Sequence, residues 1–198
     1  MVLGIIILII AVCFFLYFKT LDFRAKKEVY SEIGRKLNLS TSFSNNILGK
    51  FSLEGELNGY KFRISDFSFT KNDNTVRATK IIFKNPPQMW NFIISEENYL
   101  TRIGDNIGAG DIQIGDEKLD YKYEFKCSSI KYFKELFDDK TKIKLAEMSP
   151  YFRGSITKKG KRIVLEYNQP LNDPITIKPI LIQISFIIYL MNRAKEIE

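Results

Sequence analysis

Glycines and carboxylates gather in one stretch of the chain, GDNIGAGDIQIGDEKLDYKYEF, which covers residues 104–125. Such residues serve phosphate-binding loops, calcium loops and other divalent-ion sites. The stretch lacks the Gly-Lys-Ser/Thr ending of a phosphate loop, and its aspartates would repel phosphate. It also departs from the EF-hand spacing of calcium ligands. One metal hypothesis stays open, in which Asp111, Asp116 and Asp120 converge on a divalent ion.

A structural role accounts for the same residues more simply. Glycine permits backbone angles that other residues avoid, so the glycines of residues 104–110 suit a winding loop. Gly115 and Asp116 then predict a tight turn. This turn leads into a strand over 119–127, where apolar and polar residues alternate. We therefore assign no catalytic, cofactor-binding or metal-ligating residue.

The chain contains no histidine. This removes the most common general base, the most common zinc ligand and the usual partner of a serine or cysteine nucleophile. Cys13 and Cys127 lie far apart, and we expect both to be free thiols. The prediction is a protein that is not an enzyme. The alternative is a hydrolase or transferase that works through the carboxylates between Asp111 and Asp120, with or without a metal.

The glycine-rich segment also carries a resemblance. GAGDIQIGDEKLDYKYEFK resembles the pattern G-x-x-D-I-x-I-G-D-x-x-F-D-x-x-F of a family of uncharacterised bacterial proteins, membrane-anchored or cytoplasmic. Matching positions are Gly108, Asp111, Ile112, Ile114, Gly115, Asp116 and Asp120, with Leu119 and Tyr123 where the pattern has phenylalanine. LNGYKFRI and WNFIISEEN are similar to the family's upstream strands. The resemblance covers Leu48 to the C-terminus and implies an α+β fold, but no activity and no catalytic residue.

An apolar segment opens the chain: residues 2–18, VLGIIILIIAVCFFLYF, contain no charge. As a helix with a rise of 1.5 Å per residue, this segment spans about 26 Å, at the short end of what crosses a bilayer. No basic residue precedes it and bulky residues continue to its end, so it does not fit a cleaved signal peptide. We expect an uncleaved transmembrane helix that contacts the lipid bilayer.

Basic residues follow this segment at Lys19, Arg24, Lys26 and Lys27, and none precedes it. The positive-inside rule therefore places this flank in the cytoplasm. The expected localisation is the cell inner membrane, single-pass, with the N-terminus outside and the C-terminal domain cytoplasmic.

The net charge of +7 belongs to the chain after this segment. Beside an anionic leaflet, each basic group near the surface contributes about 1 kcal/mol of attraction. RGSITKKGKRIVLEY predicts a hairpin with Gly160 in its loop, which groups Lys158, Lys159, Lys161 and Arg162 at one tip. We expect this basic tip to contact anionic lipid headgroups or another membrane protein. No nucleic-acid recognition motif is present, so we expect no nucleic-acid partner.

The remaining elements predict one globular unit. Residues 20–38 suit a juxtamembrane helix, and FSLEGELNGYKFRISDFSF suits a hairpin that turns at Asn58–Gly59. A slip in its alternation predicts a bulge near Ser65–Asp66. Residues 88–95 suit a strand or a helix, and the dense apolar run favours a strand. The C-terminal segment, residues 175–191, predicts a helix on the sheet, with a second membrane segment as the alternative.

The predicted fold class is therefore α+β: an antiparallel sheet of about six strands with helices on one face, preceded by one N-terminal transmembrane helix. The expected organisation is an anchor over 1–18, a juxtamembrane helix and linker over 19–47, and an α+β domain over 48–198. The leading function hypothesis is a non-enzymatic binding or scaffold module that is held at the membrane and faces the cytoplasm.

Overall fold

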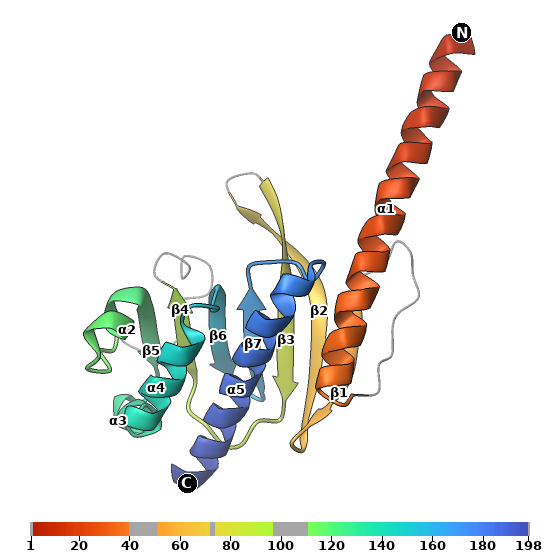
Figure 1. Cartoon of the computed structure of the whole chain (residues 1–198). Helices are drawn as coiled ribbons and strands as arrows, with labels where there is room; N and C mark the ends of the chain where they lie inside the picture. Colours follow the sequence, from red (N-terminus) through yellow and green to blue (C-terminus); the bar gives the residue numbers. More distant parts are fainter. Residues whose placement is uncertain (1, 40–50, 72–73, 97–110, 198) are drawn as a thin grey trace.

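Seven antiparallel strands form one sheet in the computed structural model, which describes residues 2–39, 51–71, 74–96 and 111–197. Their order across the sheet is β1-β2-β3-β7-β6-β4-β5 (Figure 1). The strands are β1 (Ser52–Leu57), β2 (Tyr60–Lys71), β3 (Asn74–Lys84), β4 (Phe92–Glu96), β5 (Tyr123–Cys127), β6 (Gly154–Lys159) and β7 (Arg162–Tyr167). The α+β class is confirmed. The count of about six strands is wrong: the hairpins β1–β2 and β6–β7 and the three other strands make seven in one sheet.

Helices cover one face of this sheet (Figure 1). They are α1 (Val2–Lys36), α2 (Glu117–Lys122), α3 (Ile130–Leu136), α4 (Asp139–Met148), the short 3-10 helix η3 (Pro174–Thr176) and α5 (Ile177–Ile197). Beneath them, one fully buried residue from each strand contributes to a continuous row across the sheet: Leu53, Ile64, Ile81, Leu165, Ile156, Ile94 and Phe125. This row lets one core extend from β1 to β5.

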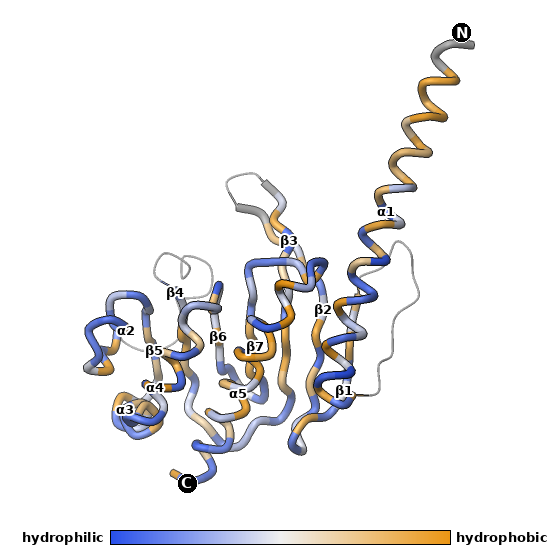
Figure 2. The backbone as a smooth tube through the Cα atoms, in the orientation of Figure 1, coloured by the Kyte–Doolittle hydropathy of each residue, from blue (hydrophilic) through white to orange (hydrophobic). Residues whose placement is uncertain are grey.

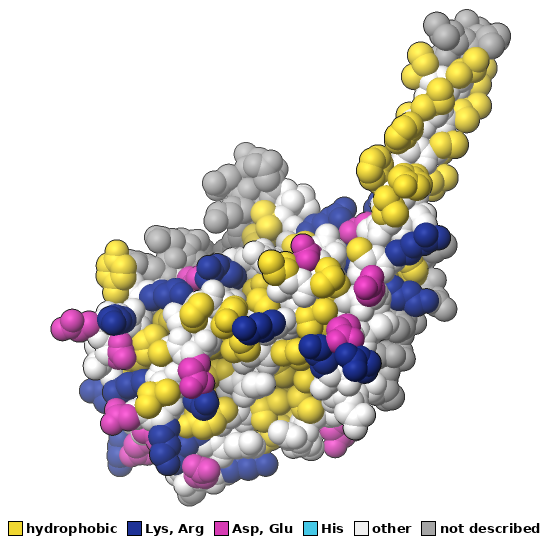
Figure 3. Space-filling model, viewed as in Figure 1, with side chains coloured by type: hydrophobic (Ala, Val, Ile, Leu, Met, Phe, Trp, Pro, Cys, Tyr) yellow, Lys and Arg dark blue, Asp and Glu magenta, His cyan; other side chains and the backbone are white. Residues whose placement is uncertain are grey.

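The expected anchor and juxtamembrane helix are one continuous helix, α1. Its first half is apolar and projects away from the sheet, as the orange tube of Figure 2 and the yellow side chains of Figure 3 show. Its second half packs on the sheet, where Tyr30 and Ile33 are fully buried. The helix ends where Asn38 adopts a left-handed conformation and the Leu39 N–H donates to the Gly34 carbonyl at 2.8 Å, a common helix C-terminus. The linker predicted after it lies mainly outside the described residues.

Among the residues that the structure describes, two helical segments are long and apolar enough to cross a membrane. In Ile5–Lys36 the most apolar stretch has no buried residues, whereas in Pro174–Ile197 half of the most apolar stretch is buried. Within the second segment, Ile180, Ile184 and Leu190 of α5 are fully buried in the core. In this fold α5 is a core helix, so we treat α1 alone as the candidate membrane span.

The first hairpin has the predicted register. Leu57 pairs with Tyr60 across a two-residue turn, in which Asn58 and Gly59 both have positive φ. Asparagine and glycine tolerate these angles better than other residues, and a turn of this type matches the twist of the two strands. The turn therefore fixes which side chains of β1 and β2 enter the core.

The bulge expected near Ser65–Asp66 is not present, because β2 pairs with β3 without interruption from Phe62 to Lys71. The alternation changes for another reason. Asp66 lies on the helix-covered face, where Lys26 Nζ and the Tyr30 hydroxyl donate to its carboxylate at 2.8 and 2.9 Å. A carboxylate with two such donors is accepted at a position where an apolar residue was expected.

The strand expected over 119–127 begins later than predicted. Its first residues belong to α2, and only the part from Tyr123 onward forms β5. Asp116 caps α2 by accepting hydrogen bonds from the backbone N–H groups of Lys118 and Leu119, both at 3.1 Å. A cap of this kind stabilises a helix by about 1 kcal/mol, which favours helix over the alternating pattern here. The strand predicted within 88–95 is confirmed as β4.

The two ends of the sheet have different surroundings (Figure 1). The anchor end lies on the side toward which the apolar half of α1 projects, and it includes the β2–β3 hairpin and the start of α5. The distal end lies opposite and includes the Asn58–Gly59 turn, the β6–β7 turn and the end of α5. The predicted basic tip therefore lies at the distal end, away from the apolar half of α1.

Candidate functional site

The aspartates singled out by the sequence bind backbone groups of their own segment. Asp120 accepts hydrogen bonds from three successive backbone N–H groups, those of residues 114–116, at 2.8–3.1 Å. Asp116 caps α2, and Asp111 accepts from the Phe125 N–H at 2.9 Å beside the outer edge of β5. Among the residues that the structure describes, no group of three potential ligands could hold a metal ion. This geometry supports a structured turn; the glycines of residues 104–110 lie outside the described part.

A polar pair that the sequence did not suggest joins α2 to α4. Lys122 Nζ lies 2.9 Å from Ser149 Oγ, a spacing found in serine–lysine nucleophiles. The same ammonium also donates to the Ser149 carbonyl at 2.5 Å. Burial lowers the pKa of Lys122 and Arg153 lowers it further, whereas Glu96 raises it. Because the amine is held by a carbonyl at the end of α4, the pair acts as a helix cap.

The basic tip contains one buried lysine. Lys158 is 3% exposed and lies on the helix-covered face between Phe92 and Ile163. Its Nζ donates to the carbonyl oxygens of Met89 at 3.0 Å and Gly160 at 2.7 Å. Burial lowers the pKa of Lys158. Strand alternation turns this residue inward, so it supports the turn from within and is not available to a partner at the surface.

The other three residues of the tip are exposed, and a fourth cation joins them. Arg162 pairs across the strands with Lys159 on one side and with Lys84 on the other, while Lys161 lies in the turn. We call Lys84, Lys159, Lys161 and Arg162 the distal cations. Like charges directly opposite one another on neighbouring strands are destabilising. Within the described part of the chain, none of the four forms a salt bridge with a carboxylate.

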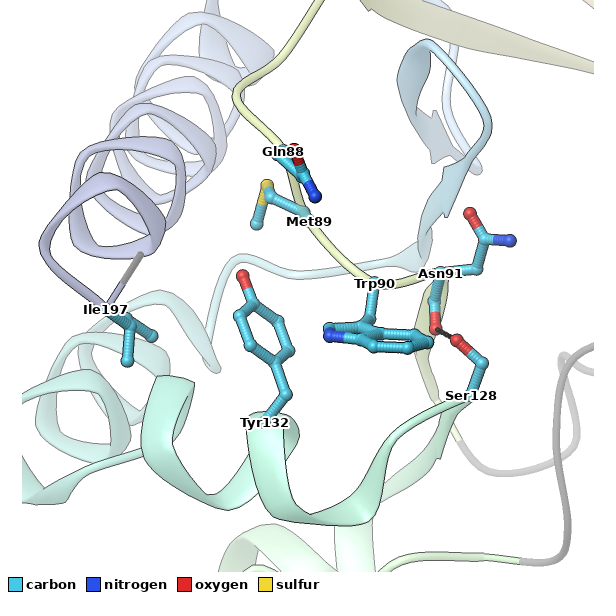
Figure 4. Close-up of a pocket in the computed structure, with 7 residues that line it drawn as sticks. All are labelled: Gln88, Met89, Trp90, Asn91, Ser128, Tyr132 and Ile197. Atoms are coloured by element: carbon cyan, nitrogen blue, oxygen red, sulfur yellow. Dashed lines mark hydrogen bonds between the residues drawn. The ribbon is translucent and has the colours of Figure 1, made fainter.

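A hollow of about 860 Å³ lies near these cations. The connector between β3 and β4 forms one wall, and the ends of α3 and α5 form the other (Figure 4). Its lining residues are Gln88, Met89, Trp90, Asn91, Ser128, Tyr132 and Ile197. In Figure 4 the Tyr132 ring stands between Ile197 and Trp90, and Met89 lies across from it. Trp90, the one tryptophan of the chain, is 54% exposed.

Backbone constraints hold the connector in place. Pro86–Pro87 lack N–H groups, so the β3 ladder cannot continue through them. The Asn85 N–H donates to the Lys161 carbonyl, and the Gly160 N–H donates to Asn91 Oδ1, both at 3.0 Å. These bonds fasten both ends of the connector to the β6–β7 turn. The hollow and the distal cations therefore lie at the same end of the sheet. Lys84, Lys159 and Arg162 alternate with the buried Phe83, Lys158 and Ile163, so they point to the face opposite the helices that wall the hollow. We call the hollow and the distal cations together the distal site.

The chemistry of the distal site suits binding. Its aromatic and sulfur-containing side chains offer apolar contact area, and its cations attract anions. The nearby thiol of Cys127 is buried, and burial raises its pKa, which disfavours the nucleophilic thiolate. Both cysteines are free thiols, as predicted.

The sequence grouped three of the four distal cations, together with the buried Lys158, but it indicated neither Lys84 nor the hollow. It assigned Trp90 to the interior of a strand because of the apolar run that follows it. The signal that could have placed Trp90 is Pro86–Pro87, since a strand is not expected to begin directly beside two prolines.

Comparison with known protein families, curated proteins and solved structures finds no match. The resemblance to a family of uncharacterised bacterial proteins therefore stays a prediction. The geometry of the distal site and its position relative to α1 are the features that bear on function.

Proposed function

We propose that this chain is a membrane-anchored, non-enzymatic binding module that faces the cytoplasm and holds an acidic segment of another protein at its distal site. The observation that carries the proposal is the half-exposed Trp90 in a hollow at the same end of the sheet as four cations that form no salt bridge with any described carboxylate. In this proposal an apolar side chain of the partner enters the hollow, and the acidic part of the segment passes round the end of the sheet to meet the distal cations.

The arrangement of the cations supports an anionic partner. Lys84, Arg162 and Lys159 repel one another across three strands, which lowers the stability of the free protein. An acidic segment laid across them would convert this repulsion into attraction. Because the cations are exposed, such contacts speed association and contribute specificity more than they contribute affinity.

The hollow supports a protein segment with an apolar anchor. Its volume of about 860 Å³ lies within the range of pockets that bind small molecules or anchor side chains. Exposed tryptophan and tyrosine at such positions supply much of the binding energy of many protein interfaces. A bound side chain would contact Trp90 and Tyr132 together.

Distance from the bilayer favours a protein over the lipid surface as the partner. Asp22, which is four residues and about 6 Å of helix beyond Phe18, forms an ion pair with Arg77 of β3. From Arg77 to Lys84, β3 extends about 24 Å further toward the distal end. The distal cations thus lie roughly 30 Å below the end of the apolar segment, nearly four Debye lengths at physiological salt, so the leaflet's surface potential is screened there.

The cytoplasmic orientation rests on the basic flank of α1. Lys19, Arg24 and Lys27 follow the apolar segment, and the positive-inside rule places them in the cytoplasm. Protease added outside intact cells should leave a C-terminal tag on the full chain uncut, and should remove it after the membrane is permeabilised. Removal of the tag from intact cells would overturn this orientation.

Trp90 offers a direct test of the distal site, because it is the one tryptophan and its emission reports on the hollow. The full chain in detergent micelles is titrated with a short peptide rich in Asp and Glu that carries one central Phe. We expect saturable binding with a shift of the Trp90 emission to shorter wavelength. The same peptide with Ser in place of Phe, or with Lys in place of the acids, should bind more weakly by at least tenfold.

A charge-matched pair of variants completes this test. The triple variant Lys84→Gln, Lys159→Gln, Arg162→Gln should lose binding, whereas Lys118→Gln, Lys134→Gln, Lys140→Gln removes the same charge elsewhere and should retain it. Oligothymidylate and anionic vesicles serve as the nucleic-acid and lipid probes. A Trp90 response to either of these but not to the peptide, or to no probe at all, would refute the proposed partner.

A further inference from the structure

The β2–β3 hairpin extends from the anchor end of the sheet beside α1. Figure 1 shows it rising above the other strands on the side toward which the apolar half of α1 projects. Two ion pairs fix its height relative to α1: Lys26 with Asp66 of β2 at 2.8 Å, and Asp22 with Arg77 of β3 at 3.6 Å. These contacts allow the level of the hairpin to be counted along the helix.

Between the two contacts, the hairpin and α1 advance by similar steps. From Lys26 to Asp22 is one helical turn, a rise of about 6 Å. On the hairpin, the corresponding step is from Asp66 to Ser68, because Ser68 is the cross-strand partner of Arg77. Two strand residues rise about 6.7 Å. The steps are thus nearly equal as far as Arg77, and beyond it the hairpin continues toward the anchor side while leaning away from α1 (Figure 1).

The paired strands continue beyond Arg77. Three more pairs follow, up to Lys71 opposite Asn74, and they add about 10 Å. The same distance along α1 leads from Asp22 past Phe18, where the apolar segment ends. Because only about 6 Å of α1 separates Asp22 from Phe18, the hairpin is long enough to reach the level at which α1 enters the hydrocarbon even though it leans away from the helix. The headgroup layer on each side of a bilayer is about 5–8 Å thick, so the hairpin extends through it.

We propose that the β2–β3 hairpin is a second contact between the domain and the bilayer, and that its partner is the headgroup layer around α1. Phe67 and Phe69 lie on one face of this hairpin with their ring centroids 5.6 Å apart, and both are partly exposed. Aromatic side chains favour the membrane interface. Arg77 and Arg24 are exposed at the same level, where each basic group attracts anionic lipid.

This contact goes beyond the proposed partner binding, and it rests only on α1 being in the membrane. A helix alone fixes the depth of a domain but leaves it free to tilt and to rotate. With the hairpin as a second contact, the sheet is held upright on the leaflet. The distal site is then held pointing away from the lipid.

The test places a fluorophore at single cysteines in the full chain, after Cys13→Ala and Cys127→Ala. Thr75→Cys labels the hairpin, Lys161→Cys labels the distal turn, and Lys19→Cys labels the end of the apolar segment. The three proteins are reconstituted in nanodiscs of phosphatidylcholine and phosphatidylglycerol that contain lipid with a spin-labelled headgroup. We expect quenching at Thr75→Cys to be close to that at Lys19→Cys, and at least threefold stronger than at Lys161→Cys.

Each outcome decides a separate point. Strong quenching at Lys19→Cys with none at Thr75→Cys would overturn the hairpin contact and leave the anchor intact. Absence of quenching at Lys19→Cys would overturn both, because α1 would not be in the bilayer. A repeat in phosphatidylcholine alone separates the length of the hairpin from its attraction to anionic lipid. Quenching at Thr75→Cys that persists shows that the length alone brings the hairpin to the headgroups, and quenching that disappears shows that the contact depends on anionic headgroups. Binding of the acidic peptide at the distal site is measured independently of these results.

Discussion

Replacing Asp66 by asparagine removes the charge that fastens α1 to the sheet. Its Oδ2 accepts from Lys26 Nζ at 2.8 Å, and its Oδ1 accepts from the Tyr30 hydroxyl at 2.9 Å. The side chains of Lys26 and Asp66 are only 10% and 15% exposed. In the variant, Lys26 keeps Asp22 as an acidic neighbour at 3.6 Å, while the shape of the side chain at position 66 is preserved.

The expected loss follows from these contacts. Removing one partner of a fully buried ion pair costs about 3–5 kcal/mol. Residual exposure and the remaining Asp22 reduce this cost, so we expect Asp66→Asn to lower the free energy of unfolding by about 2–3 kcal/mol. Tyr30→Phe removes one hydrogen bond and should cost about 1 kcal/mol. The double variant should lose less than the sum, because both donors bind the same carboxylate.

The assay is urea unfolding of the full chain in detergent micelles, followed by Trp90 fluorescence. The matched control is Glu54→Gln, which removes the pair of Glu54 with Arg63 at 3.3 Å, where both side chains are about half exposed. An exposed pair of this kind is worth less than about 1 kcal/mol. If Asp66→Asn destabilises the protein no more than Glu54→Gln does, the ion pair does not hold α1 on the sheet and the reasoning fails.

Three further predictions concern other parts of the molecule. Trp90→Ala should weaken binding of the acidic peptide by roughly 30- to 150-fold, measured by calorimetry. The exposed half of this side chain offers on the order of 100 Å² of contact area, at about 25 cal/mol per Å². An unchanged affinity would exclude the hollow as the binding site of the peptide. Burial raises the pKa of Tyr123 to about 12 from 10. The contribution of this shift to stability, about 2–3 kcal/mol, is complete below pH 10 and is lost as the pH rises through 12. Tyr123→Phe should therefore flatten the decline of the unfolding free energy above pH 10, and an equal decline in both proteins would contradict this assignment. Gly154→Ala should destabilise the fold by more than about 1–3 kcal/mol in urea unfolding, because Gly154 has φ +133° and an added Cβ would overlap the Glu166 carbonyl oxygen. The control is Gly115→Ala, which should cost less because Gly115, at φ +79°, has open space around it.

Local signals in the sequence predicted the local structure well. The Asn58–Gly59 turn determined the register of the first hairpin because few other residue pairs accept two positive φ angles. The absence of charge over residues 2–18 indicated an apolar helix, and the structure leaves residues 5–18 of α1 exposed. In both cases the information lies within a short window, so no distant contact could reverse it.

Predictions that depended on distant partners were less accurate. Asp66 suggested a bulge because its two donors, Lys26 and Tyr30, are about forty residues earlier in the chain. Lys158 suggested an exposed tip because its acceptor, the Met89 carbonyl, belongs to a connector that is far away in the sequence. In each case a buried polar residue is satisfied by a group that periodicity cannot reveal.

The candidate site was predicted only in part for the same reason. The exposed cations of the β6–β7 turn are adjacent in the sequence and could be grouped from it. The hollow unites the β3–β4 connector, α3 and the end of α5, and only the folded sheet brings these segments together. Trp90 becomes meaningful only when Tyr132 and Ile197 are seen beside it.

The separation of the two ends makes their functions separable by mutation. The hairpin at Arg77 and the distal cation Arg162 lie about 24 Å apart along β3, and substitutions at such distances usually add within about 0.5 kcal/mol. Arg77→Gln should therefore weaken the lipid contact of the hairpin without changing the affinity for the acidic peptide, and Arg162→Gln should do the reverse. In the double variant, each property should equal its value in the matching single variant. A change of more than about threefold in peptide affinity on Arg77→Gln would show that the sheet couples its two ends, and the hairpin would then control the distal site as well as hold it away from the bilayer.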